Sequence, residues 1–480
     1  MKMLFVIPRI KSMYGDYGVK SSHPHVGVAY LCSWLKKNNI EVDLFDDGLG
    51  VSRDKLLDKI KNTHADLIGL TMFSYCYQSG YDLINFIKEH TDIPLVIGGP
   101  HVSSTKTQIL EETKADFSVK HEGEKPLLSL LNFIVKKRND YGNIRGLIWR
   151  NYTGQIIENE DEKFLNSKEL DAAPYPDLEA FELRKYDCYD SKTLPLITSR
   201  GCPYGCNYCS VRLSMGRNFR SRSALNVFEE ISYWYNKGWT NFDINDDCFT
   251  LDMKRAHEIC DMIIQSKIKI KFSLYNGIRA DRVDYNLLKK MKEAGCVFLS
   301  FGCETGNDEI LRKIQKGLTI KQVYKASKWA HSLGIKHSVN FIIGHTGETY
   351  KTAISSLSFA RSLPCDFVNF YNLVPYPNTD AYMWVKKNGT FLVDEKDYLK
   401  YISYRDNTPI FETSEFTKEE RIKIMKIGFN LYEKKALQFK LGKTLGLMSY
   451  YISRISFVHR IALRMLESKT VWKLLRALSK

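Results

Sequence analysis

The stretch LPLITSRGCPYGCNYCS, residues 194–210, places three cysteines directly after a predicted β-strand. Its apolar first half predicts the strand, and the two glycines and the proline between it and the second cysteine keep the following segment a loop. A loop of this kind allows three thiols to converge on one point. Thiolates are soft ligands that bind iron–sulfur clusters and zinc. We therefore predict a metal centre on Cys202, Cys206 and Cys209.

The spacing of these cysteines leaves two kinds of metal centre open. A cubane cluster has four irons and usually four cysteine ligands, so three local thiolates would leave one iron free for another ligand. A catalytic metal needs such an open position. A zinc ion whose fourth ligand comes from elsewhere in the chain fits the same spacing.

Six short apolar runs alternate with helical patterns from residue 194 to about 375. The predicted strands are 194–199, 240–245, 268–275, 297–302, 336–343 and 366–374. Six consecutive βα units predict a partial (β/α)6 barrel related to the TIM barrel. In such barrels the chemistry takes place on the loops that follow the strands.

The cysteine pattern, with an aromatic residue before the last cysteine, resembles the signature of radical S-adenosylmethionine enzymes. The resemblance extends to FDINDDCF at 242–249, MKEAGCVFLSFGCETG at 291–306, FIIGHTGE at 341–348 and VPYPNT at 374–379. It covers about residues 190–385 and weighs strongly against zinc. It implies a [4Fe-4S] cluster whose open iron holds S-adenosylmethionine. One electron then cleaves the sulfonium and releases a 5′-deoxyadenosyl radical, which takes hydrogen from an unactivated carbon.

The resemblance also suggests contacts to S-adenosylmethionine through acidic residues at strand ends. Asp246 and Asp247 end the second barrel strand, where the family contacts the methionine amino group, and a carboxylate suits an ammonium. Glu304 is expected at the ribose hydroxyls or the amino group. The alternative for each acidic residue is a solvated loop position or a helix cap.

Three further residues are expected to contact the adenine on the basis of the same resemblance. Tyr208 is expected next to the cluster and the adenine, and Gly344 and Gly347 would let the backbone approach the adenine closely.

The first 140 residues predict a second α/β unit. Apolar runs at 3–7, 41–45, 67–71, 94–97 and 116–119 alternate with stretches of helical period. This alternation predicts a doubly wound, Rossmann-like parallel sheet covered on both faces. Such sheets bind ligands beyond the carboxyl ends of their strands.

Residues 1–135 resemble the cobalamin-binding domain that precedes many radical S-adenosylmethionine enzymes. The motifs are HVGVAYL at 25–31, ADLIGL at 65–70, VIGGPH at 96–101 and EGE at 122–124. Cobalamin is therefore an expected cofactor, held by Gly98, Gly99 and the 73–78 loop with Ser74.

The pattern Asp-x-His-x-x-Gly, whose histidine binds cobalt in better-known cobalamin domains, does not occur here. His23, His25 and His101 lie near predicted strand ends without that spacing. A loop hydrogen bond is the alternative role for each of these histidines.

The predicted domain boundaries follow from these patterns. Residues 1–140 form the cobalamin-binding-like domain, 141–190 a connector with a hairpin, 191–395 the barrel, and 396–480 a basic helical region without strand signals.

The composition is that of a globular protein, with 44% hydrophobic and 26% charged residues among 480. The net charge of +15 is uneven, because residues 431–480 hold eleven Lys and Arg against two Glu. No nucleic-acid recognition module accompanies this charge, so we expect no nucleic-acid partner. Basic and apolar residues alternate at helical spacing between Arg460 and Lys480. They predict either a helix docked on the barrel or one in peripheral contact with a membrane.

Eleven cysteines, no secretory leader and no apolar run of 18 residues predict a cytoplasmic protein. A peripheral position on the inner face of the membrane is the alternative. The cysteines outside the 202–209 motif are expected to be core residues.

Three hypotheses for the function follow. The first is cobalamin-dependent methyl transfer to carbon or phosphorus of a small biosynthetic substrate. In this scheme one S-adenosylmethionine methylates cobalt and a second supplies the radical, with electrons from a donor such as flavodoxin or ferredoxin. The second is a radical ring closure, rearrangement or oxidation, with or without cobalamin. The third is a cobalamin or iron–sulfur sensor, or an electron-transfer protein.

Overall fold

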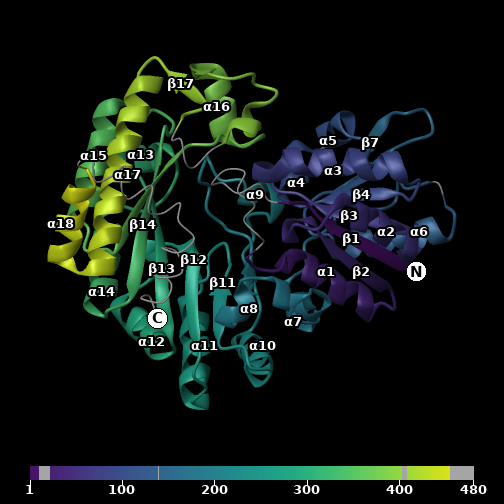
Figure 1. The fold of residues 1–480 in the computed structure, drawn as a ribbon, viewed down its shortest axis with the longest axis horizontal. Helices are drawn as coiled ribbons and strands as arrows, with labels where there is room; N and C mark the ends of the chain where they lie inside the picture. The colour runs from purple at the N-terminus through teal and green to yellow at the C-terminus, as the bar shows by residue number, and fades with distance from the viewer. Residues whose placement is uncertain (10–21, 139, 403–407, 455–480) are drawn as a thin grey trace.

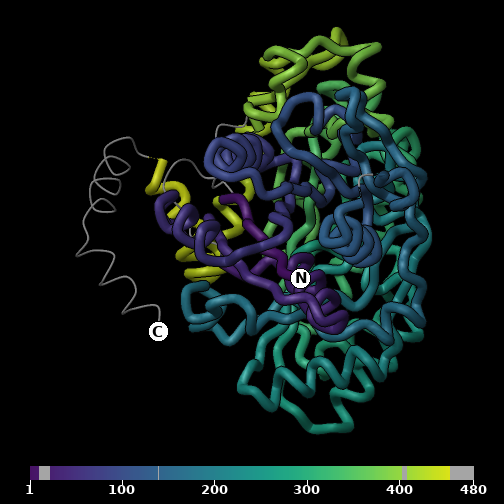
Figure 2. Tube along the Cα trace, turned by 90° about the vertical axis from the view of Figure 1, so that its right-hand side faces the viewer, coloured from purple at the N-terminus to yellow at the C-terminus, as the bar shows by residue number. Residues whose placement is uncertain are grey.

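The computed structural model describes residues 1–9, 22–138, 140–402 and 408–454. Two α/β units lie side by side, with the N-terminal unit on the right of Figure 1 and the barrel strands on the left. Figure 2 views the molecule from the side of the N-terminal unit, which lies in front of the barrel.

The N-terminal unit contains a seven-stranded sheet in the order β2-β1-β3-β4-β5-β6-β7. The strands are β1 (Lys2–Ile7), β2 (Glu41–Asp46), β3 (Leu67–Thr71), β4 (Leu95–Gly98), β5 (Phe117–Val119), β6 (Leu147–Arg150) and β7 (Ile156–Glu158). The first five are parallel, as predicted, and the last two are antiparallel. The hairpin expected in the connector therefore forms and extends the first sheet.

Alternating side chains of β1 pack against the two helical layers that cover the two faces of this sheet. Met3 and Phe5 belong to the core that contains α1 (Val26–Lys37) and α6 (Glu124–Val135). Leu4 and Val6 face the opposite layer, which includes α2 (Arg53–Thr63) and α3 (Tyr77–His90). Burial on both faces explains the nearly continuous apolar strands of the sequence.

The strand order reverses direction next to β1. The chain passes from β1 to β2 on one side and then to β3 on the other side of β1. Loops diverge at such a switch point and leave a crevice at the carboxyl ends of the strands, where ligands bind.

The barrel sheet is fully parallel, in the order β15-β14-β13-β12-β11-β8. Its strands are β8 (Thr193–Leu196), β11 (Asn241–Ile244), β12 (Lys271–Ile278), β13 (Cys296–Glu304), β14 (Lys336–Ile343) and β15 (Phe367–Asn372). The connecting helices are α10 (Ala224–Asn236), α11 (Met253–Ser266), α12 (Tyr285–Glu293), α13 (Asp308–Lys313), α14 (Ile320–Ser332) and α15 (Tyr350–Ser362).

All six predicted barrel strands are present, and the first one is interrupted. It divides into β8 and β9 (Ser199–Arg200), and β9 pairs with β10 (Arg220–Ser221). The interruption lies at Thr198, whose backbone N–H donates to the Asp246 carboxylate rather than to a neighbouring strand.

The C-terminal region contains a strand that the sequence did not predict. After α16 (Asp380–Asn388), β16 (Gly389–Phe391) pairs with β17 (Phe411–Thr413). The expectation of no strand beyond residue 396 is therefore wrong, because a three-residue strand is too short to leave a periodic pattern.

Two helices end the described chain. α17 (Lys418–Leu441) packs against β14, β15 and α15, and α18 (Lys443–Ser453) packs against α17. The basic pattern predicted between Arg460 and Lys480 lies outside the described residues. No helix in the described ranges is long and apolar enough to cross a bilayer.

Candidate functional site

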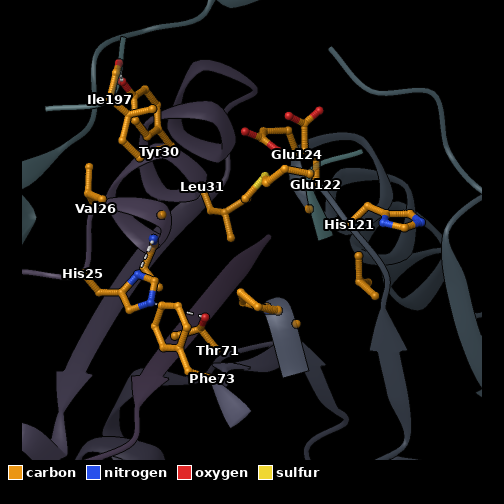
Figure 3. Close-up of a pocket in the computed structure, with 18 of the residues that line it drawn as sticks. His25, Val26, Tyr30, Leu31, Thr71, Phe73, His121, Glu122, Glu124 and Ile197 are labelled. Carbon is orange, nitrogen blue, oxygen red and sulfur yellow. Dashed lines mark hydrogen bonds between the residues drawn. The ribbon is translucent and has the colours of Figure 1, made fainter. Parts of the chain in front are cut away.

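A cavity of about 500 Å³ lies between the two domains. On one side it is lined by the strands and strand ends of the N-terminal sheet, including Phe5, Thr71 and Gly98, and by the start of α1 (Figure 3). On the other side it reaches Arg200 and Asp247 of the barrel, next to the cysteine loop. The cavity therefore occupies the switch-point crevice of the first domain.

Glycines keep the N-terminal wall of this cavity open. Gly98 has free space in front of it, since an added Cβ would find nothing nearer than Val119 O at 4.0 Å. Gly99 has a φ of +100°, and its Cβ would lie 2.7 Å from Met72 O, so only glycine fits. Both predicted cobalamin contacts line the cavity. Ser74 is not among the lining residues, and its hydroxyl lies 3.0 Å from His101 Nδ1.

His25 lines the cavity in a fixed orientation. Its Nδ1 accepts a hydrogen bond from Val28 N at 3.2 Å and so caps α1. Burial lowers the pKa of His25 to about 4, so the ring is neutral at pH 7. Because Nδ1 has no proton, Nε2 bears it and points a donor towards Thr71 Oγ1, 3.5 Å away (Figure 3). In this tautomer His25 offers a hydrogen bond rather than a lone pair for a metal.

These residues fit cobalamin, and His25 offers no lone pair to its cobalt. The cavity size lies in the range of cofactor sites, and its N-terminal wall is mainly apolar side chains and glycine backbone. Other lining residues on this wall are Met3, Leu31, Gly69, Leu70, Val96, Val119, Gly123 and Leu127.

A buried ion-pair network joins the two domains at the edge of the cavity. Arg200 Nη1 donates to Glu122 Oε1 at 2.9 Å and to Glu124 Oε1 at 2.8 Å. Arg220 Nη1 donates to the same Glu122 oxygen at 2.6 Å. The other Glu122 oxygen accepts from Leu165 N at 2.7 Å. Burial alone would raise the pKa of Glu122, but the two arginines hold it below its usual value.

The cysteine loop begins two residues after Arg200. Gly201 has a φ of +83°, and a Cβ there would collide with Asn218 O, so glycine is required. Further along, Asn207 N donates to Ile314 O at 3.1 Å and Cys209 N to Cys206 O at 3.1 Å. These bonds fix the path of the loop.

The three cysteines of the loop are free thiols, of which Cys206 is buried and the other two are half-buried. Burial raises the pKa of Cys209 to about 12, so a metal must displace its proton on binding. Among the described residues no group of three or more His, Cys, Asp and Glu side chains is close enough to hold one metal ion. A cubane cluster distributes its thiolates over separate irons, so the three cysteines stay the predicted ligands of such a cluster.

Asp246 and Asp247 have different environments. Both Asp246 oxygens are engaged inside the barrel, by Thr198 N at 2.6 Å and by the Thr198 and Ser199 hydroxyls at 2.5 Å. Asp247 accepts from Gly201 N at 2.9 Å and lines the cavity. Burial raises the pKa of Asp247 to about 6. Of the two, Asp247 is the one placed to meet a ligand.

Glu304 is aimed at the cysteine loop by a distorted strand end. A register shift lies between Gly302 and Glu304, and Glu304 has a φ of +72°, which is costly for a side chain of this size. The carboxylate accepts from Lys316 Nζ at 2.7 Å, and Lys316 also reaches the Tyr208 hydroxyl at 3.2 Å. Strained, re-aimed residues of this kind are frequent at binding sites.

The glycines of the 344–348 loop have structural partners as well as their predicted adenine role. Gly344 has a φ of +100° and lies against the guanidinium of Arg421 from α17, where a Cβ would collide. Gly347 has a φ of +69° and lies against Lys313. Glu348 accepts from Gly344 N at 2.6 Å and from His345 N at 3.2 Å, and its burial raises its pKa to about 7.

Several buried polar atoms near Tyr208 have no hydrogen-bond partner. They are Asn207 Oδ1, both ring nitrogens of His345, and Glu348 Oε1. The His345 ring packs against Tyr208, with centroids 5.1 Å apart. Orphaned buried atoms are costly, and a bound ligand can satisfy them. This region therefore fits a polar cofactor such as S-adenosylmethionine.

Three residues of the site were not singled out by the sequence. Arg200 precedes the cysteine motif, His345 interrupts the apolar and glycine pattern of 341–348, and Arg279 stacks on Tyr204 within the cysteine loop at 3.4 Å from the ring centre. The signal available for His345 was a polar ring in a loop expected to contact adenine. Nothing in the sequence pairs Arg200 with Glu122, 78 residues away.

Comparisons with known proteins agree with this architecture. Residues 196–360 match the radical SAM superfamily, and residues 18–131 match the B12 binding domain. An uncharacterised methyltransferase of Pyrococcus horikoshii, PH0819, is 30% identical over 89% of this chain and 92% of its own length. The chain belongs to the radical SAM superfamily and has an N-terminal B12-binding domain. Its cofactors are a [4Fe-4S] cluster, S-adenosylmethionine and cobalamin.

Two further relatives act on different compounds. The anaerobic magnesium-protoporphyrin IX monomethyl ester cyclase of Rubrivivax gelatinosus is 26% identical over 86% of this chain and 74% of its own length. The cytidylyl-2-hydroxyethylphosphonate methyltransferase of Streptomyces wedmorensis is 24% identical over 79% of this chain and 80% of its own length.

Solved structures share the fold. The radical S-adenosylmethionine methyltransferase TsrM of Kitasatospora setae, with cobalamin and a [4Fe-4S] cluster bound, has a TM-score of 0.70 at 18% identity. The match covers 82% of this chain and 77% of that one. OxsB, a cobalamin-dependent S-adenosylmethionine radical enzyme, has a TM-score of 0.70 at 18% identity, over 99% of this chain and 74% of that one.

Proposed function

We propose that this enzyme transfers a methyl group to an unactivated carbon or to phosphorus of a small biosynthetic substrate. The observation that carries the proposal is the cavity between the domains, which extends from the glycine wall of the B12-binding domain to the edge of the cysteine loop. A methyl donor and a radical source would thus face one chamber. The uncharacterised methyltransferase and the phosphonate methyltransferase among the relatives support this direction.

The proposed ligands of the cluster are Cys202, Cys206 and Cys209. When bound, the cluster and S-adenosylmethionine supply a radical that takes a hydrogen atom from the substrate, and cobalamin supplies the methyl group. Gly98 and Gly99 leave room for cobalamin, and His25 lines the same space with its Nε2 donor directed at Thr71 Oγ1.

The remaining residues around the loop position S-adenosylmethionine and exclude water. Glu304, oriented by Lys316, and Asp247 provide carboxylates for its hydroxyl and amino groups. Tyr208 and His345 form one aromatic wall, and the 344–348 loop presents backbone next to it. An electron donor such as flavodoxin or ferredoxin is part of the proposal.

A second candidate function is a radical ring closure without methyl transfer. The magnesium-protoporphyrin ester cyclase among the relatives favours it. Both candidates cleave S-adenosylmethionine to 5′-deoxyadenosine, but only methyl transfer also produces S-adenosylhomocysteine.

The test uses the full chain, reconstituted without oxygen with iron, sulfide and hydroxocobalamin. We expect about four irons per chain together with bound cobalt. On addition of S-adenosylmethionine and a strong reductant, we expect 5′-deoxyadenosine and S-adenosylhomocysteine, the second only when cobalamin is bound. 5′-Deoxyadenosine without S-adenosylhomocysteine, despite bound cobalt, would favour ring closure. A loaded protein that cleaves no S-adenosylmethionine would instead indicate a sensor or electron-transfer protein.

A further inference from the structure

The outward face of α18 is apolar although it faces solvent. Leu445, Met448, Tyr451 and Ile452 are 62%, 55%, 60% and 47% exposed. They follow one another at intervals of three, three and one residues, so they lie on one side of the helix. Apolar residues on a surface helix normally face the core, and here they face away from it.

The inward face of α18 is narrow and closely packed. Gly446 is its buried residue, and a Cβ at this position would collide with the backbone of Gln438 in α17. Small side chains are thus needed where the two helices meet. The large apolar side chains of α18 point to the opposite side and contribute little to holding the helix in place.

Positive charge lies at one end of this apolar face. Lys440 and Lys443 stand at the turn between α17 and α18, and both are exposed. Arg454, after the last turn of α18, is engaged by Glu433 and Asn430 of α17. Residues 440–454 contain no Asp or Glu. An apolar helix face bordered by basic residues is typical of helices that lie in the surface of an anionic bilayer.

Two partners other than an anionic bilayer could cover this face, and charge disfavours both of them. A second copy of the chain would place the same basic residues against each other. Residues 455–480 of this chain contain six Lys and Arg against one Glu, so they too would bring like charge to the face. An anionic lipid surface has the opposite charge and accepts apolar side chains below its headgroups.

We propose that the outward face of α18 binds peripherally to membranes that contain anionic lipids. Leu445, Met448 and Ile452 enter the interface between headgroups and acyl chains, while Lys440 and Lys443 contact lipid phosphates. The position of α18 on the side of the barrel away from the N-terminal domain keeps the cavity between the domains clear of the bilayer (Figure 1).

The test measures co-sedimentation of the full chain with vesicles of phosphatidylcholine alone or of phosphatidylcholine mixed with phosphatidylglycerol, whose negative charge attracts basic segments. We expect binding to the anionic vesicles that weakens with added salt, and little binding to the neutral ones. The double variant Leu445→Asp, Met448→Asp should lose at least tenfold in anionic vesicle binding and keep its thermal midpoint.

A matched control changes the same residue types on other faces. Leu225 of α10 and Met383 of α16 are 54% and 59% exposed and lie away from α18. The variant Leu225→Asp, Met383→Asp should bind vesicles as the parent does. Equal binding by both double variants would overturn the proposal and indicate residues 455–480 instead. A dimer in solution that only the α18 variant dissociates, with no vesicle binding by the parent, would identify a second copy as the partner.

Discussion

The joint between the two domains and the surroundings of Tyr208 handle buried polar groups in opposite ways. At the joint, each carboxylate oxygen of Glu122 has a donor, and Arg200 has two acceptors. Around Tyr208, both nitrogens of His345 and one oxygen of Glu348 have no partner. A satisfied buried network stabilises an architecture, whereas unpaired buried groups are costly and a bound ligand can satisfy them. The difference makes the polar atoms around Tyr208 the ones to test for ligand contact.

The cysteine loop should show the largest effect. Replacing Cys206 by Ala should remove the cluster, so iron per chain and 5′-deoxyadenosine both fall below detection. Cys303→Ala is the matched control, because Cys303 is a buried core cysteine and should keep both. Retained cleavage of S-adenosylmethionine in Cys206→Ala would show that the cluster is bound elsewhere.

The ion-pair network between the two domains should show the second-largest effect. Glu122→Ala leaves Arg220 without its carboxylate and Arg200 with only one, so we expect the free energy of unfolding to fall by about 3–5 kcal/mol. Urea unfolding measures this change. Glu160→Ala, which removes an exposed pair with Arg145, should cost less than about 1 kcal/mol. If the free energy of unfolding falls by the same small amount in both variants, the ion-pair network does not hold the domains together.

Glu348 predicts a pH dependence of stability. Burial raises its folded pKa to about 7, above the unfolded value, so the folded state holds its proton more tightly. Stability from this group is therefore fully present below pH 4.5 and lost as the pH rises through 7, by about 3 kcal/mol in total. Between pH 5 and pH 8 the thermal midpoint should fall less in Glu348→Gln than in the parent. An equal fall would show that Glu348 is ionised throughout.

His345 tests whether the unpaired polar atoms around Tyr208 serve to bind a ligand. If its nitrogens are kept for S-adenosylmethionine, His345→Leu should weaken binding of that ligand about tenfold, the worth of a hydrogen bond or two. The ligand-free thermal midpoint should not fall, since no bond is lost. Titration calorimetry on cluster-loaded protein gives the affinity. A lowered midpoint with unchanged affinity would make His345 a core residue.

His25 should show the smallest effect. His25→Ala removes the cap of α1 and should cost about 1 kcal/mol of stability. The visible and electron paramagnetic resonance spectra of bound cobalamin should stay unchanged, because Nε2 bears a proton and does not ligate cobalt. A change of the axial ligand signal in His25→Ala would contradict this tautomer.

The sequence predicted the two sheets almost completely, and the site only in part. Strand periodicity and turn residues are local, so β3 and β14 were placed at their observed bounds. Pairings over long separations leave no local trace, which is why the bond between Arg200 and Glu122 was not foreseen. The predicted contact of Asp246 stays a prediction, since its oxygens are engaged by Thr198 and Ser199. The difference from Asp247 is set by the break between β8 and β9.

The short distance along the chain between Arg200 and Cys202 bears on how the protein is made. Synthesis runs from the N-terminus, so Glu122 and Glu124 leave the ribosome before Arg200 and the cysteines do. Arg200 then contacts both carboxylates only two residues before Cys202. The ion pairs that join the domains therefore also fix where the cysteine loop begins.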